Sequence, residues 1–275
     1  MIETKVIRKL QDLTYLTWDK TRHSSGTAGS YLKSYEMENN KKLYYKLSCY
    51  DSLRGITGHE CVNEIIVDRL LSIMGLRHLN YQLLNARIVI DDKEYETYLC
   101  VSEDYKNAGD SKTALDDYYD MEKNEGESIL DFCERMGWID YIYEMLIVDF
   151  LIINRDRHGA NIEVIRNKYT GDIGLAPLFD HGLSLVYSCG TEKEVEEFDS
   201  MRDIPVQCYV GSKSVYDNLN IIPKSKLPKL RRLDENDKEY IFKDLQGILP
   251  NIFYDKIWEI IWNRWKYYED MCYKG

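Results

Sequence analysis

The chain has 275 residues, of which 44% are hydrophobic, and its formal net charge at pH 7 is −11. That length and apolar fraction allow a substantial buried core in one large domain or two small ones. The negative charge counts against nucleic acid and anionic lipid surfaces as partners. The first proline is Pro177, and no linker-like or repeated segment divides the chain.

The sequence carries no feature typical of an oxidising compartment or a membrane. Its seven cysteines form no Cys-x-x-Cys pair, which indicates a reducing compartment. Glu3, Lys5, Arg8 and Asp12 interrupt the N-terminus, which therefore lacks a signal-peptide core, and no apolar run is long enough to span a bilayer. We expect a cytoplasmic, soluble protein with no membrane partner.

A run of small residues over 24–30, Ser-Ser-Gly-Thr-Ala-Gly-Ser, predicts a loop whose backbone N–H groups approach phosphates. The run matches neither the Walker pattern nor the three-glycine loop of protein kinases, so a plain surface loop is the competing interpretation. As a nucleotide-binding loop, it would make its contacts through Ser25, Gly26, Thr27, Ala28 and Gly29.

A strand and a helix follow this loop. The strand-like run 43–47 carries Lys46 in its middle, which is either an exposed strand lysine or one that reaches ATP phosphates. A stripe of apolar residues predicts a helix over 59–74, capped by Thr57 or Gly58 and ended by Gly75.

Two glutamates, Glu60 and Glu64, lie on the predicted helix. Either is a candidate to pair with Lys46, as a strand lysine pairs with a helix glutamate in active protein kinases. The alternative is that both are solvated.

Two further strands are predicted over 87–90 and 95–101, and they would complete a strand-rich N-lobe spanning residues 1–103. The adenine-binding backbone would follow at Cys100, Val101, Ser102 and Glu103. A C-lobe would span residues 104–275, with helices over 130–136, 141–153, 236–248 and 254–268.

Acidic residues are concentrated between Asp91 and Asp140, where sixteen acidic and five basic residues give a net charge of −11. Such a surface would attract a basic protein segment, although solubility alone also explains it.

The most informative segment is 154–161, Asn-Arg-Asp-Arg-His-Gly-Ala-Asn, which follows an apolar, buried-helix pattern over 138–153. Phosphoryl transfer from ATP needs a carboxylate near the acceptor hydroxyl, and amide and carboxylate oxygens that hold Mg²⁺. Asp156, Asn161 and Asp180 supply those groups, and a polar turn with capping side chains is the alternative. His158 would contact phosphate or orient Asp156.

The residues after this segment predict a β-hairpin, with strands over 162–165 and 173–178 and a turn between them. The hairpin would bring Asp180 back beside Asp156 and Asn161.

These motifs resemble the HipA-like serine/threonine kinases, a bacterial branch of the protein-kinase-like fold. The family's catalytic loop has Asn, Asp, His and Asn at the spacing of Asn154, Asp156, His158 and Asn161. Its metal-binding segment resembles 176–180, and its helix begins with Asn-Glu, as at 63–64, which favours Glu64 over Glu60. The resemblance spans about residues 24–185.

The resemblance also implies regulation and sets limits. In the family, a serine of the loop that corresponds to residues 24–30 can be autophosphorylated, and the loop then leaves the nucleotide site. Larger members carry an additional N-terminal domain that helps contact a DNA-binding antitoxin, whereas only about twenty residues precede the loop here, so an antitoxin partner is not implied. The loop hydroxyls that could be modified are Ser24, Ser25, Thr27 and Ser30.

The sequence therefore predicts an α+β, two-lobed, protein-kinase-like fold and an ATP- and Mg²⁺-dependent kinase for Ser or Thr hydroxyls on a protein. Lys46 would hold the ATP phosphates, Glu64 would orient Lys46, Asp156 would be the catalytic base, and Asn161 and Asp180 would bind metal. Two alternatives remain: a kinase for a small molecule or an inositol lipid, and a non-catalytic nucleotide-binding regulator.

Overall fold

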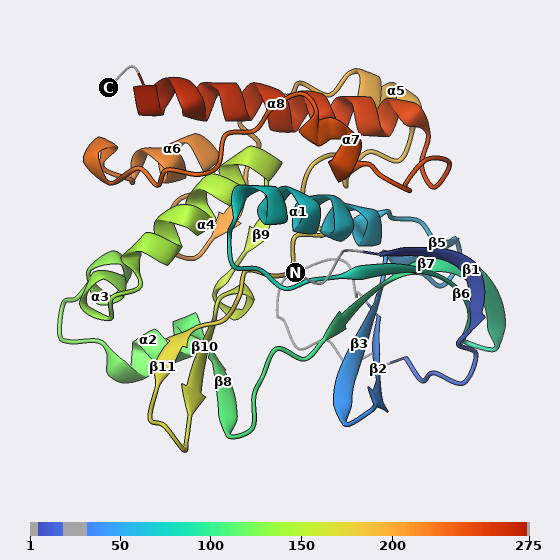
Figure 1. Ribbon diagram of the computed structural model, residues 1–275, viewed down its shortest axis with the longest axis horizontal. Helices are drawn as coiled ribbons and strands as arrows, with labels where there is room; N and C mark the ends of the chain where they lie inside the picture. Colours follow the sequence, from blue (N-terminus) through green and yellow to red (C-terminus); the bar gives the residue numbers. More distant parts are fainter. Residues whose placement is uncertain (1–4, 19–31, 274–275) are drawn as a thin grey trace.

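The computed structural model describes residues 5–18 and 32–273. The loop over 24–30, including Ser25, Gly26, Thr27, Ala28 and Gly29, lies outside the described residues. Figure 1 shows an α+β arrangement, with a strand-rich N-terminal part and a mostly helical C-terminal part. This confirms the predicted fold class.

The N-terminal part is built on a five-stranded sheet with the order β1-β6-β7-β3-β2. β1 runs parallel to β6, and the other neighbouring strands are antiparallel. The strands are β1 (Val6–Asp12), β2 (Lys33–Glu38), β3 (Lys41–Leu47), β6 (Gln82–Ile90) and β7 (Lys93–Glu103). The small hairpin β4 (Tyr50–Asp51) and β5 (Gly55–Ile56) precedes the first helix.

That helix, α1 (Glu60–Met74), ends where the sequence predicted, because Gly75 adopts the left-handed conformation with φ +74°. Its start differs from the prediction. The N-cap is His59, whose side chain makes no capping hydrogen bond, and the Ser48 hydroxyl instead accepts a hydrogen bond from the Cys61 N–H at 3.1 Å. A side chain from the preceding loop thus replaces the local cap.

Side-chain alternation along β3 fixes the direction of Lys46. Tyr45 and Leu47 belong to a small core on one face of the sheet, together with Leu99 of β7. Cys100, the register partner of Lys46, belongs to the large core that contains α1. Because successive side chains of a strand point to opposite faces, Lys46 projects toward the α1 side.

The C-terminal part is mostly helical, and in Figure 1 α8 crosses the top of the molecule above α1. Its helices are α2 (Leu115–Glu122), α3 (Ile129–Arg135), α4 (Ile139–Ile152), α5 (Glu192–Glu196), α6 (Val215–Asn220), α7 (Asp237–Ile241) and α8 (Asn251–Tyr273), with 3-10 turns η1 (Gly159–Asn161) and η2 (Lys224–Lys226).

Two small sheets position the 154–161 segment. The predicted hairpin forms as β10 (Glu163–Asn167) and β11 (Ile173–Leu175), and β8 (Asp110–Ala114) joins it on the other edge. β9 (Asp156–Arg157) pairs in parallel with β12 (Gln207–Cys208). The 154–161 segment therefore lies between α4 and the hairpin.

The helix predicted over 236–248 is wrong in length, since α7 ends at Ile241. Arg69 of α1 donates hydrogen bonds to the carbonyls of Ile241 at 3.0 Å and Lys243 at 2.6 Å. Arg8 of β1 donates to the Asp244 carbonyl at 2.9 Å, and Asp244 has φ +62°. These carbonyls therefore accept hydrogen bonds from side chains of other elements and not from the backbone N–H groups of a longer helix.

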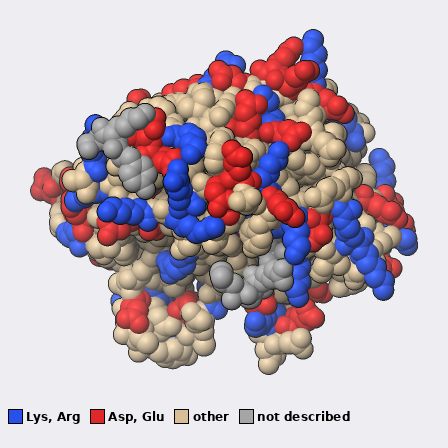
Figure 2. All heavy atoms as spheres, turned by 45° about the horizontal axis from the view of Figure 1, so that its top comes forward, with Lys and Arg blue, Asp and Glu red and all other residues tan. Residues whose placement is uncertain are grey.

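The face that Figure 2 shows, which includes the side of α7 and α8, carries intermingled acidic and basic side chains. Ion pairs in the C-terminal part include Lys238 with Asp255 at 3.0 Å and Arg232 with Glu269 at 2.7 Å. In the described part of the chain, no helix combines the length and apolar character that a membrane span requires.

Candidate active site

Lys46 lies between two carboxylates that come from distant parts of the chain. Its Nζ is 2.8 Å from Asp180 Oδ1 and 3.2 Å from Glu64 Oε1. The three side chains reach this point from β3, from α1 and from the segment that follows β11. Glu60, the other candidate on α1, instead accepts a hydrogen bond from the Cys49 N–H at 3.0 Å. The structure thus brings Lys46 together with Glu64.

Burial and charge act in opposite directions on this group. Burial lowers the pKa of Lys46, but the negative charges of Asp180 and Glu64 outweigh it, and the pKa lies well above its ordinary value. Burial raises the pKa of Asp180, but the positive charges of Lys46 and Lys33 lower it below its ordinary value. Lys46 and Asp180 are therefore both charged near neutral pH.

Glu64 is almost fully buried and has two kinds of donor. Its Oε2 accepts a hydrogen bond from the His181 N–H at 2.9 Å, while Oε1 faces Lys46. Burial raises its pKa, and the nearby Lys46 charge opposes this effect. One carboxylate of α1 thus fixes both the strand lysine and the backbone next to Asp180.

Asp156 has a carboxylate oxygen that is buried and not hydrogen-bonded. No atom of residues 5–18 and 32–273 makes a hydrogen bond to its Oδ1. His158 Nε2 lies 3.7 Å from this oxygen, beyond hydrogen-bonding distance. Burial raises the pKa of Asp156, His158 opposes the rise, and the Asp180 charge adds to it. A carboxylate with a raised pKa accepts a proton more readily.

Asn161 lies at the end of the 154–161 segment. Its Nδ2 donates a hydrogen bond to the Asp156 carbonyl at 2.7 Å. With the amide nitrogen engaged in this way, the amide oxygen is the atom that can coordinate a cation.

The buried pair of Arg157 and Asp149, which the sequence analysis did not include in the site, holds this loop in place. Arg157 donates from Nε to Asp149 Oδ2 at 2.9 Å and from Nη2 to Asp149 Oδ1 at 2.8 Å. Its Nη1 donates to the carbonyls of Asn161 at 3.1 Å and Phe179 at 3.0 Å. One guanidinium therefore joins α4, the 154–161 segment and the residue before Asp180. The available signal was Asp149, an acidic residue in an apolar run.

The four residues predicted to bind adenine lie at the end of β7. Cys100 and Val101 have register partners on both β3 and β6, whereas Ser102 and Glu103 have theirs on β3 in the described sheet. Glu103 also forms an ion pair with Lys41 at 2.6 Å. The backbone with an open side therefore begins at Ser102.

A second group of polar atoms lies next to Phe179. The Tyr105 ring packs against the Phe179 ring, with centroids 6.2 Å apart, and Lys112 pairs with Glu163 Oε1 at 2.9 Å. Within the described residues, the Tyr105 hydroxyl and Glu163 Oε2 are buried without a hydrogen bond. Burial, followed by the charge of Asp104, raises the pKa of Glu163 to about 7. Sequence analysis had not selected these residues.

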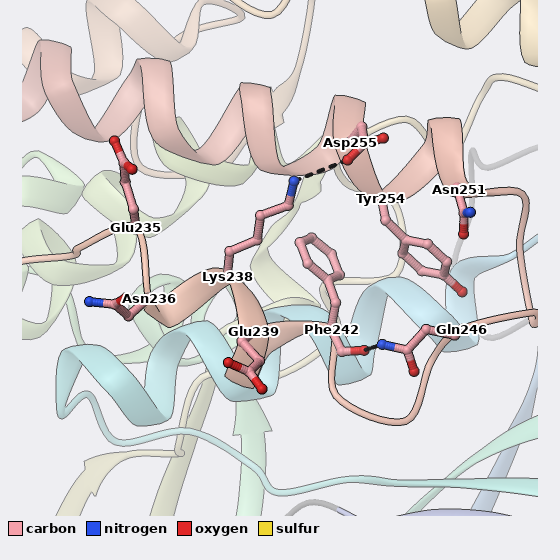
Figure 3. Close-up of a pocket in the computed structure, with 9 residues that line it drawn as sticks. All are labelled: Glu235, Asn236, Lys238, Glu239, Phe242, Gln246, Asn251, Tyr254 and Asp255. Carbon is pink, nitrogen blue, oxygen red and sulfur yellow. Dashed lines mark hydrogen bonds and ion pairs between the residues drawn. The ribbon is translucent and has the colours of Figure 1, made fainter.

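A cavity of about 530 Å³ lies elsewhere, between α7 and α8. Figure 3 shows its lining, where Lys238 reaches across to Asp255 and the rings of Phe242 and Tyr254 lie side by side. None of its lining residues belongs to the group around Lys46 and Asp156.

Comparisons with known proteins give similarity in structure only. The chain is similar to the crystal structure of a Helicobacter pylori proinflammatory kinase, CtkA, with 14% identity and a TM-score of 0.61 over 96% of this chain and 97% of that one. Weaker similarity is found to the golgi casein kinase (13% identity, TM-score 0.44, 90% of this chain and 72% of that one). Weak similarity is also found to the Shewanella oneidensis MR-1 complex of HipA, HipB and operator DNA, with 14% identity and a TM-score of 0.40 over 92% of this chain and 60% of that one.

No protein-family model and no curated protein sequence matches the chain. At 14% identity, the CtkA comparison shows a shared fold. The chain adopts the kinase-like fold that its resemblance to the HipA-like kinases predicted.

Proposed function

We propose that the protein is an ATP- and Mg²⁺-dependent kinase that transfers a phosphoryl group to Ser or Thr hydroxyls of a protein. The observation that carries this proposal is the position of Lys46 between Glu64 and Asp180, at 3.2 and 2.8 Å. A strand lysine paired with a helix glutamate and adjoining a metal-binding aspartate is the arrangement that positions ATP phosphates in kinases.

The residues present fit a magnesium ion. Asp180 offers a partly exposed carboxylate, and Asn161 offers the amide oxygen opposite its engaged nitrogen. Mg²⁺ prefers such oxygen ligands and takes the rest of its shell from phosphate and water. When bound, the ion would offset the negative charge of the phosphates. Asp180 and Asn161 are held in register by Arg157, which donates to the carbonyls of Asn161 and Phe179.

The nucleotide would extend from Lys46 toward the end of β7. Ser102 provides the first open backbone of that strand, and Tyr105 and Glu163 each have a buried polar atom to offer. We therefore propose that the base and ribose lie beside Ser102, Tyr105 and Glu163.

Asp156 would act on the acceptor. The hydroxyl oxygen of the acceptor forms a bond to the γ-phosphorus of ATP, the bond from that phosphorus to the ADP oxygen breaks, and the hydroxyl proton passes to Asp156 Oδ1. This oxygen is suited to the role because it is hydrogen-bonded to no described residue and its pKa is raised. His158, 3.7 Å away, would orient it. We propose no nucleic-acid, membrane or antitoxin partner.

The acceptor class is tested by following γ-labelled ATP. The purified protein is incubated with labelled ATP, Mg²⁺ and a dephosphorylated cell lysate, and the proteins are then precipitated with acid. The proposal expects label on Ser or Thr in the precipitate. Label in a soluble metabolite or lipid would indicate a different acceptor, and ATP binding without any transfer would indicate a non-catalytic regulator.

A further inference from the structure

The connection between α1 and β6 packs against the segment that carries Asp180. The Leu79 N–H donates a hydrogen bond to the Leu178 carbonyl at 2.8 Å, and the Leu178 N–H donates to the Arg77 carbonyl at 3.1 Å. Arg77 also donates through its guanidinium to the Leu175 carbonyl. Two backbone hydrogen bonds and one side chain thus clamp the chain two residues before Asp180.

Tyr81, at the end of this connection, extends the clamp to Asp180 itself. The Asp180 N–H donates a hydrogen bond to the Tyr81 hydroxyl oxygen at 3.3 Å. The Tyr81 ring is buried, with 2% of the residue exposed, and Lys46 Nζ lies 5.7 Å from its centroid. The hydroxyl is therefore fixed beside both the lysine and the backbone of the proposed metal ligand.

Asp180 needs such a contact because its backbone is in the left-handed region, with φ +61°. A non-glycine residue occupies that region at an energetic cost, and it stays there when its surroundings hold it. The Tyr81 hydroxyl oxygen accepts a hydrogen bond directly from the N–H of this strained residue.

A buried carboxylate of α1 fixes the connection in turn. Asp68 lies four residues after Glu64, on the same side of the helix. Its Oδ2 accepts from the Tyr81 N–H at 2.8 Å, and its Oδ1 contacts His78 Nε2 at 2.8 Å and Asn80 Nδ2 at 3.2 Å. The buried side of this helix, predicted to be apolar, thus carries an acidic residue that contacts His78, Asn80 and Tyr81.

We propose that Tyr81 is a positioning residue for Asp180, and that Asp68 couples it to α1. This inference rests on the proposed function, in which Asp180 holds the metal. α1 then acts on the phosphate end of the site by two routes, one through Glu64 to Lys46 and one through Asp68 and Tyr81 to Asp180. A displacement of α1 disturbs the lysine and the metal ligand together.

The first test does not depend on activity. Tyr81→Phe removes only the hydroxyl, so the ring and the N–H that bonds Asp68 remain. Amide hydrogen exchange is measured on the nucleotide-free protein for the peptide that contains residues 177–182. We expect this peptide to exchange about two- to tenfold faster in Tyr81→Phe, which corresponds to the loss of one hydrogen bond.

Tyr254→Phe is the matched control. Tyr254 is also buried, with 6% exposed, and its hydroxyl donates to the Leu245 carbonyl at 2.6 Å. The Tyr254→Phe variant should show a decrease in melting temperature comparable to that of Tyr81→Phe, with amide exchange in 177–182 unchanged. Asp68→Asn is a second variant that keeps the Tyr81 hydroxyl but weakens its anchor, and it should raise exchange in the same peptide.

The second test asks whether the hydrogen bond from Asp180 to Tyr81 also affects the Mg²⁺ dependence of the reaction. The Mg²⁺ concentration that gives half-maximal phosphoryl transfer should rise about two- to tenfold in Tyr81→Phe, with the KM for the acceptor unchanged. Exchange in 177–182 equal to that of wild type would overturn the positioning role, whatever the activity. Faster exchange with unaltered Mg²⁺ dependence would overturn the link to Asp180 as metal ligand. A wild-type protein that binds no MgATP would instead overturn the proposed function, and the inference with it.

Discussion

Arg157 and Asp149 form a two-point ion pair in the interior, with N–O distances of 2.9 and 2.8 Å. Arg157 is among the largest fully buried side chains, with 1% exposed. Since its remaining nitrogen donates to the carbonyls of Asn161 and Phe179, the pair fixes both proposed metal-binding segments to α4. Burial lowers the pKa of Arg157, but the Asp149 charge outweighs burial and raises it above its ordinary value.

Removal of this arginine should be costly. Arg157→Ala leaves the Asp149 carboxylate buried without its partner, and such a change typically destabilises a protein by about 3–5 kcal/mol. Arg157→Lys keeps the charge but cannot form the two-point contact, so it should lower stability by less and still weaken phosphoryl transfer. Urea denaturation gives the free energy of unfolding for each variant.

The control for this experiment is Arg87→Ala. Arg87 pairs with Glu96 at 3.7 Å on the surface, and both side chains are well exposed. Exposed pairs contribute about 0–1 kcal/mol. If Arg157→Ala were no more destabilised than Arg87→Ala, the buried pair would have no special structural role.

Asp156 and Asp180 should differ in how they affect nucleotide binding. Asp180→Asn should weaken the Mg²⁺-dependent binding of ATP, because it removes the charge of a proposed metal ligand. Asp156→Asn should leave that binding nearly unchanged, because Asp156 faces the acceptor. Calorimetric titration with and without Mg²⁺ separates them. ATP binding that neither EDTA nor Asp180→Asn alters would assign the carboxylate another role.

His59 gives a prediction for stability at low pH. Burial lowers the pKa of His59 to about 4, from an ordinary value of 6.5. The unfolded chain therefore binds a proton that the folded chain does not, and the folded state loses stability as the pH falls from 6.5 to 4. The difference in pKa corresponds to about 3 kcal/mol.

His59→Gln removes this titration and leaves every other titratable group in place. Between pH 7 and pH 4, wild type should lose about 3 kcal/mol more of its unfolding free energy than His59→Gln does. Urea denaturation at pH 7, 5.5 and 4 measures both proteins. Parallel losses would show that His59 titrates near its ordinary pKa in the folded state.

Autophosphorylation of the loop over 24–30 is a further prediction, based on its four hydroxyls. A phosphate there adds about −1.5 to −2 charges beside the place proposed for the ATP phosphates, so ATP affinity should fall. Mass spectrometry of the protein incubated with MgATP should find phosphate between residues 22 and 33. Modified protein with undiminished ATP affinity would count against this regulation, as would the absence of phosphate from these residues.

The segment 154–161 could be singled out from the sequence because its pattern depends on short spacings within one loop, whereas Lys46 and its two carboxylate partners lie far apart in the chain. Asp156 and Asn161 are five residues apart in one loop, and the turn between β10 and β11 returns the chain toward them. The choice of Glu64 over Glu60 came from the resemblance, and the structure shows its physical reason: Glu60 is bound to the Cys49 N–H.

The supporting residues could not be predicted because their partners are distant in sequence. Asp149 was one of several acidic residues on a helix predicted to be mostly buried, and Asp68 lay on a helix predicted to carry an apolar stripe. Nothing local showed that Arg157 and Tyr81 would reach them. The predicted length of α7 was wrong for the same reason. Arg69 of α1 and Arg8 of β1 donate hydrogen bonds to carbonyls within residues 241–244. Helical periodicity does not report such contacts.

The proposed role of Asp156 is to receive the proton of an acceptor hydroxyl in an ATP-dependent transfer. Its most direct test is the rate at which label passes from γ-labelled ATP to protein, measured for wild type and Asp156→Asn at equal MgATP occupancy. The rate for Asp156→Asn should be lower by a factor of about 10² to 10⁴. Equal rates for the two proteins would contradict it.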